Sequence, residues 1–311
     1  VVGCTGVVRD HLVAMRRLVQ HDAVDRFVGR VEHPHGQPIG RPGCDRFGDI
    51  KRKRRLTSLM PADLDTEISR LNAIISTSLP ALVDAMDAAR GLTTLAVDSG
   101  EKPSVASAIV KYHLTERMRR VIDDAMDVHG GRGICMGPRN YLGRIYQAIP
   151  ISITVEGANI LTRSLIIFGQ GAIRCHPYVL QEMLAAADPD KSRGLADFDE
   201  ALFAHIGFTL SNAVRALVLG FGGERFLDVP EVGKKGLYLR RISRLSAAFS
   251  FAADVAMLTL GGDLKRREKI SGRFADVLSH LYLASSVIKH HEDAGRPAED
   301  TALVAWAIED S

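Results

Sequence analysis

The sequence predicts an all-α protein made of two helical units, on three observations. Apolar residues recur at helical spacing over most of the chain after residue 86, and glycine or proline separates the long periodic stretches. Only one short β-branched run, Ile151–Val155, interrupts this pattern. Apolar residues make up 46% and charged residues 25% of the 311 residues, which is typical of a globular protein with room for two modest cores.

Charge and cysteine content exclude several classes of function. A net charge of +3 gives no strong field for nucleic acid or for an anionic membrane. The four cysteines lie far apart and form no CxxC pair, so they indicate neither a zinc site nor a disulfide scaffold. Their pattern is typical of a reducing compartment. The first residues show no signal-peptide pattern. We therefore expect a cytoplasmic protein with no nucleic-acid partner and no metal.

Residues 1–85 form an atypical N-terminal segment without an assigned domain. Arg30–Gly48 mixes His, Pro and Gly without a period, and Lys51–Arg55 is a basic run without interleaved aromatic residues. A solvated loop is the favoured interpretation of that run, and binding of phosphate or nucleic acid is the weaker alternative. A weak helix follows Pro61.

The periodic pattern begins at Met86, and we assign residues 86–175 to the first helical unit. Met86–Val97 predicts a helix, and Gly100–Pro103 breaks it and leaves Ser104 as the N-cap of the next one. That helix is expected over 105–129 and ends at Gly130-Gly131. Its predicted buried stripe includes Val105, Ile109, Tyr112, Ile122 and Met126, and its predicted outer face carries Glu116, Arg117 and Arg120.

The rest of this unit is expected to be less regular. Pro138–Pro150 is predicted to be a connecting loop, and Ile151–Val155 a short β-branched run that ends at Glu156. A helix is expected over Asn159–Phe168, closing at Gly169.

Residues 176–311 are assigned to a second all-helical unit. Helical patterns run over Leu195–Leu219, Leu237–Leu260 and Phe274–His290, and a further helix is expected over Thr301–Ile308. The apolar stretch Leu245–Gly262 carries Asp254 at its middle. We interpret it as a buried core helix rather than a membrane span, because a central carboxylate is costly in a bilayer.

Glu156 is the most informative residue. It is the only acid between Asp127 and Glu182, and its neighbours are apolar residues and glycine. An apolar setting would make a carboxylate a better base near neutral pH. The alternative is an N-capping or ion-paired glutamate at the start of the following helix, which the pattern alone favours.

Two glycine turns and the histidines give weaker signals. Gly130–Gly133 could let backbone approach a ligand, but it ends a helix rather than following a strand, so it is not a dinucleotide fingerprint. Gly169-Gln170-Gly171 fails the same test. The histidines at 113, 129 and 176 are interpreted as solvated or core residues.

Taken together, Asp127–Gly133 and Ile153–Asn159 resemble the acyl-CoA dehydrogenase family, in which a GGxG turn precedes an EG(T/A) motif. A wider segment from Glu101 to Arg163 is similar to the long bacterial, FadE-type fatty-acyl-CoA dehydrogenases. Later segments resemble the helical extension of that type: Thr259–Arg266 and Asp276–Ser285.

The resemblance implies a fold and a chemistry. The fold is the family's C-terminal helical bundle followed by the helical extension. Glu156 would remove the α-proton of a fatty acyl-CoA while the β-hydride passes to FAD, giving a trans-2-enoyl-CoA. Electrons would pass to an electron-transferring flavoprotein. The implied cofactor-binding residues are His129, Gly130, Gly131, Ala158 and Ile160. Gly157 would contact the substrate thioester.

It also implies a homo-oligomer, because Gly130 and Gly131 would pack against the FAD of a neighbouring subunit. Peripheral contact with the inner membrane is a further expectation.

The sequence departs from the family at Asp127, where Gln is common, and at Ala158, where Thr is usual. The family's N-terminal helical and middle β-domains have no counterpart, so we expect a truncated form. The alternative is a non-catalytic helical association module.

Overall fold

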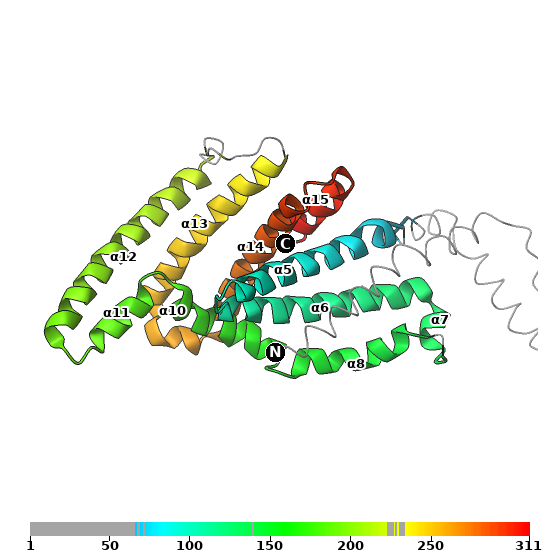
Figure 1. Cartoon of the computed structure of the whole chain (residues 1–311), viewed down its shortest axis with the longest axis horizontal. Coiled ribbons are helices and arrows are strands. Elements are labelled where there is room, and N and C mark those ends of the chain that lie inside the picture. Colours follow the sequence, from blue (N-terminus) through cyan, green and yellow to red (C-terminus); the bar gives the residue numbers. More distant parts are fainter. Residues whose placement is uncertain are drawn as a thin grey trace, which may run out of the picture.

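The computed structural model describes residues 72–138, 140–222 and 234–311, with isolated positions at 66, 69, 70, 227 and 229. Residues 1–65, which contain the basic run and the irregular N-terminal stretch, lie outside the described residues. The described parts are helical and contain no strand, which confirms the all-α prediction (Figure 1). The main helices are α5 (Leu79–Asp98), α6 (Ser104–His129), α8 (Leu142–Thr154), α11 (Val179–Ala186), α12 (Lys191–Gly220), α13 (Lys234–Leu260), α14 (Glu268–Asp293) and α15 (Thr301–Glu309).

Shorter helical segments connect these. They are η1 (Ile74–Ser78), α7 (Gly131–Ile134), α9 (Asn159–Leu161), the π-helical η2 (Thr162–Gln170), α10 (Gly171–Cys175), η4 (Gly261–Lys265) and η5 (Ala298–Asp300). The expected helices of both units are present, each extended by some residues at one or both ends.

Helix α14 lies at the centre and packs against η2, α5, α13 and α15. Small buried residues on α14, Ser271 and Ala275 among them, let η2 approach closely. A side chain on Gly169 would lie 3.1 Å from the Ser271 hydroxyl, so glycine is the residue that fits there. The expected stop at Gly169 is therefore wrong: the chain continues through η2 and α10 because Gly169 serves helix packing, not helix termination.

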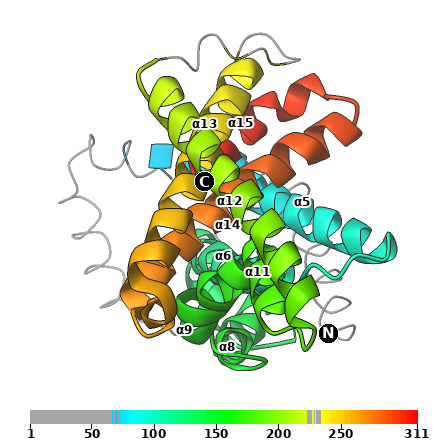
Figure 2. The same cartoon turned by 90° about the vertical axis from the view of Figure 1, so that its left-hand side faces the viewer.

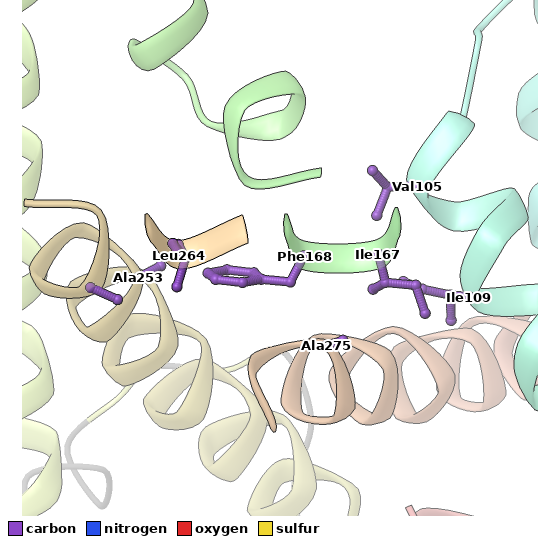
Figure 3. Close-up of a cluster of buried hydrophobic side chains, with 8 residues drawn as sticks. Val105, Ile109, Ile167, Phe168, Ala253, Leu264 and Ala275 are labelled. Carbon is purple, nitrogen blue, oxygen red and sulfur yellow. The ribbon is translucent and has the colours of Figure 1, made fainter. Parts of the chain in front are cut away.

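One apolar core joins the two units that the sequence separates. Ile167 and Phe168 of η2 contact Val105 and Ile109 of α6 on one side and residues of α13, η4 and α14 on the other (Figure 3). Phe168 stacks on Phe274 of α14 with ring centroids 4.5 Å apart. Helices α13 and α14 are thus built onto the same core as α6 and η2.

Helix α8 corrects two expectations. Residues 142–154 are helical although a loop and a β-branched run were expected there, and Pro150 lies inside the helix. Leu142, Ile145 and Ile149 recur at helical spacing on one face and pack toward α6. This packing outweighs both the β propensity of residues 151–154 and the cost of an internal proline, about 3 kcal/mol.

Two further corrections concern α6. Pro103 is its N-cap and Ser104 its first residue. Arg117, expected outside, is buried and forms an ion pair of 3.2 Å with Asp310 near the C-terminus. Val105, Ile109 and Ile122 are buried as expected.

By length and hydropathy alone, two stretches of the described residues could cross a membrane: Lys191–Gly220 and Gly236–Lys265. A third is possible if α8 and the bent segment Asn159–Cys175 count as one. Asp254, in the second stretch, is buried inside the protein, where His176 and Thr209 bond to it. The carboxylate is therefore buried as expected, but most of the helix is not: only 22% of the apolar window is buried, so the expected buried core helix is not confirmed.

Candidate active site

Glu156 lies in the four-residue connection between α8 and α9. Its backbone has φ of +56°, a conformation that glycine adopts readily and other residues rarely, and Gly157 follows at +91°. The side chain is exposed, so the expected apolar setting is absent in this chain. Ala158, not Glu156, is the N-cap of α9, and no side chain caps it.

Lys111 of α6 ties this connection to the helix pair. Its ammonium donates to the Gly157 carbonyl at 2.7 Å and to Asn159 Oδ1 at 2.6 Å. Burial lowers the pKa of Lys111, and attraction to Glu156 and Glu116 counters that effect.

Asn159 completes the anchor from the other side. Its side chain is 5% exposed, and its amide donates to Thr115 Oγ1 and Glu116 Oε1, both at 2.8 Å. The Asn159 side-chain amide therefore bonds to three residues of α6: its oxygen accepts from Lys111, and its nitrogen donates to Thr115 and Glu116. Lys111 and Asn159 were not among the predicted site residues. The only feature of the sequence that could have indicated this anchor is the spacing of Lys111 and Thr115, which lie one turn apart on a predicted helix.

Exposed apolar side chains flank Glu156 along the chain. Ile151 (60% exposed) belongs to the last turn of α8, Val155 (46%) to the connection, and Ile160 (77%) and Leu161 (45%) to α9. These exposed aliphatic groups form an apolar surface next to the connection that a ligand or partner would cover.

The second predicted group, His129, Gly130 and Gly131, lies at the far end of α8. Thirteen helical residues separate that end from the Glu156 connection, a length of about 20 Å. The chain therefore does not bring the two groups together. At Gly130 the backbone has φ of +53°, and an added side chain would meet nothing within 4 Å, so the turn is open to a ligand.

His129 and Asn140 hold this turn. The His129 ring bonds to the Ala125 carbonyl at 2.9 Å and to the Tyr141 hydroxyl at 2.8 Å. The Asn140 amide donates to three carbonyls of the turn, with Gly133 nearest at 2.8 Å. Both ring nitrogens of His129 are therefore engaged by protein, so its role is to position the turn.

The residues described have one set with the spacing of metal ligands: His176, His205 and Asp254, whose ligand atoms lie within 4.8 Å of one another. The ring of His176, predicted to be a solvated or core histidine, is largely buried within this set. Backbone amides of Tyr178 and Val179 both donate to His176 Nδ1. The neutral ring then carries its proton on Nε2 and donates it to Asp254 at 2.9 Å. Nε2 is occupied by that proton, which favours a hydrogen-bonded network over a metal site.

Two family models match the chain. Residues 79–169 match the acyl-CoA dehydrogenase C-terminal domain, and residues 173–311 match the acyl-CoA dehydrogenase C-terminal region of bacterial type. The chain belongs to the acyl-CoA dehydrogenase family. Its described helices are the C-terminal bundle of that oxidoreductase family and the bacterial-type extension. The shared core of Figure 3 joins the two matched regions.

Proposed function

We propose that the Glu156 connection is the base site of an FAD-dependent fatty-acyl-CoA dehydrogenase. The observation that carries the proposal is an exposed carboxylate on a non-glycine residue with positive φ, fixed by Lys111 and Asn159 to a rigid helix. Strained backbone of this kind persists where the surroundings hold it, and it is frequent at active sites. The family membership supplies the reaction class.

The reaction removes the α-proton of a fatty acyl-CoA thioester. Such a proton is weakly acidic, so the base must be well placed and shielded from water. The Lys111 anchor provides the placement, because it fixes the Gly157 carbonyl directly after the base. A bound acyl-CoA would provide the shielding by covering Ile160 and Val155, and the product is the trans-2-enoyl-CoA. Gly157, which has no side chain, is the proposed contact for the thioester.

The residues fit the family's cofactor. The aliphatic rim at Ile160 and Leu161 suits a flat apolar ring, and the open turn at Gly130 and Gly131 suits close approach of a second part of the cofactor. Ala158 and Ile160 would contact it on one side, and Gly130 and Gly131 on the other, where His129, predicted as a cofactor contact, instead holds the turn in place. FAD, when bound, supplies the acceptor for the two electrons and the β-hydrogen.

Because the two groups lie at opposite ends of α8, one copy does not place both against the same flavin ring. This separation supports a homo-oligomer in which the Gly130 turn of one subunit and the Glu156 connection of another serve the same FAD. We further propose an electron-transferring flavoprotein as the electron acceptor, and a cytoplasmic location with peripheral membrane contact.

A non-catalytic association module is the second candidate. The exposed apolar side chains of α12, described below, favour it. Flavin content separates the two candidates, because only the enzyme must retain FAD.

The test is the visible absorption spectrum of the purified chain with added FAD, before and after palmitoyl-CoA. We expect a bound flavin spectrum that bleaches with substrate, and no bleaching in Glu156→Gln. Asp199→Asn, an exposed acid on α12, is the matched control and should bleach normally. A colourless protein that takes up no FAD would refute catalysis by this chain and leave the association module.

A further inference from the structure

The outward face of α12 carries a continuous apolar stripe. Exposed side chains recur every three or four residues over five turns, with exposed fractions of Phe203 70%, Ile206 46%, Leu210 62%, Val214 60%, Leu217 62%, Val218 54% and Phe221 86%. Gly207 lies among them, and an added side chain there would meet nothing within 4 Å. From Phe203 to Phe221 the only charged residue is Arg215, which lies at the side of the stripe.

The opposite face of α12 is packed against its own chain. Ala201, Asn212 and Leu219 are buried there, and α11 and α13 contact the helix. Figure 2 shows α12 toward the viewer, at the outer side of the molecule, with no other described element over it. A helix that is apolar on both faces is normally covered on both. The stripe, about 27 Å long, therefore requires a partner.

The stripe is symmetric about position 212. Reversing the helix around that level pairs Phe203 with Phe221, Ile206 with Val218 and Leu210 with Val214. It also places Leu217 against Gly207, a large side chain against an open position. Each position meets a residue of matching chemistry or complementary size, as an isologous contact between identical helices requires.

Charge is compatible with the same arrangement. The exposed acids Asp197, Asp199 and Glu200 precede the stripe, so no acid of one copy would lie against residues 203–221 of the other. About the same axis, Arg215 of one copy lies opposite Thr209 of the other, so no like charges meet. An anionic bilayer, in contrast, would meet three acids at one end of the face it would have to cover.

We propose that α12 is a homodimer interface, in which the stripe of one copy packs antiparallel on the stripe of a second copy, with the two-fold axis at the level of residue 212. This contact is separate from the flavin site and does not rest on the proposed reaction. It lies on the bacterial-type extension, far along the chain from Glu156 and Gly130.

Sedimentation equilibrium of the full 311-residue chain tests the interface. We expect a concentration-dependent dimer for the native sequence and, for Leu210→Glu, a dissociation constant raised about 30-fold or more, because a charge would be buried at the centre of the seam. Leu95→Glu, on a leucine of α5 with 54% exposure, is the matched control and should dimerise like the native chain. A native chain that stays monomeric up to about 100 µM would overturn the proposal.

Disulfide trapping tests the orientation. In a chain whose four cysteines are replaced by serine, Phe203→Cys with Phe221→Cys should give a crosslinked dimer on mild oxidation, because antiparallel packing brings these positions within disulfide reach. Phe203→Cys alone should not crosslink, and a crosslink there would mean parallel packing and refute the proposed axis. Vesicle flotation on phosphatidylglycerol vesicles covers the bilayer alternative. Binding by a monomeric native chain that Leu210→Glu abolishes would assign the stripe to a lipid surface.

Discussion

The ammonium of Lys111 donates to the carbonyl oxygen of Gly157 over 2.7 Å and so ties helix α6 to the connection that carries Glu156. The same ammonium reaches Asn159 Oδ1, and Asn159 in turn bonds to Thr115 and Glu116. A single cation and a single buried amide thus fix the proposed base to a helix whose other face lies in the core.

Lys111→Met should loosen this connection. It leaves the Gly157 carbonyl and Asn159 Oδ1 without their donor, and we expect a loss of about 1–2 kcal/mol in the free energy of unfolding. Urea unfolding measures the loss, and hydrogen exchange should show faster exchange at residues 157–162. Lys289→Met is the control: its lysine forms an exposed pair with Asp293 one turn away, and the change should cost less than about 0.5 kcal/mol.

Backbone strain at Glu156 predicts that glycine is a more stable replacement at this position than alanine. With φ at +56°, Glu156→Gly should be more stable than Glu156→Ala by about 1 kcal/mol, because glycine adopts this conformation without a Cβ clash. Thermal unfolding of the two variants tests this. Equal stability would mean that the connection relaxes to another conformation once the carboxylate is gone.

Asp310→Ala should be strongly destabilising although it lies next to the last residue. Asp310 pairs with the buried guanidinium of Arg117 at 3.2 Å, and without that carboxylate the charge of Arg117 stays buried and unpaired. We expect a loss of about 3 kcal/mol in the free energy of unfolding. Asp263→Ala, which breaks an exposed pair with Arg266, should change it by less than about 0.5 kcal/mol.

Burial of His113 predicts that the protein loses stability in mild acid. Desolvation, helped by His280 and Arg117, lowers the pKa of His113 to about 3. The folded state then binds fewer protons than the unfolded state between pH 6.5 and about 3, so this contribution is present above pH 6.5 and is lost as the pH falls through that window. The expected slope is about 1.4 kcal/mol per pH unit.

Urea unfolding at pH 7 and pH 5 measures this slope. His113→Leu removes the titrating group and should reduce the pH dependence by about one proton, with the remainder due to His280 and His176, whose pKa values burial also lowers. An unchanged slope in His113→Leu would show that His113 is not the source.

The sequence by itself determined the helical class, the order of the long helices and the family. Periodic stripes such as Val105 and Ile109 on α6 required a helix, because their spacing buries one face whatever the partner. The motif around Glu156 was local as well, since a positive-φ turn and its glycine are encoded by neighbouring residues. Local residues also set the helix stop at Gly130.

Only the tertiary structure decided the rest. Helix α8 forms across a proline and a β-branched run because its stripe packs on α6, and no local propensity reveals that surface. The anchor of Glu156 by Lys111, 45 residues earlier, and the burial of Arg117 by Asp310, 193 residues later, depend on helices meeting in space. A buried charge is stable only when its partner is already in place, so such pairs are invisible until the helices are assembled.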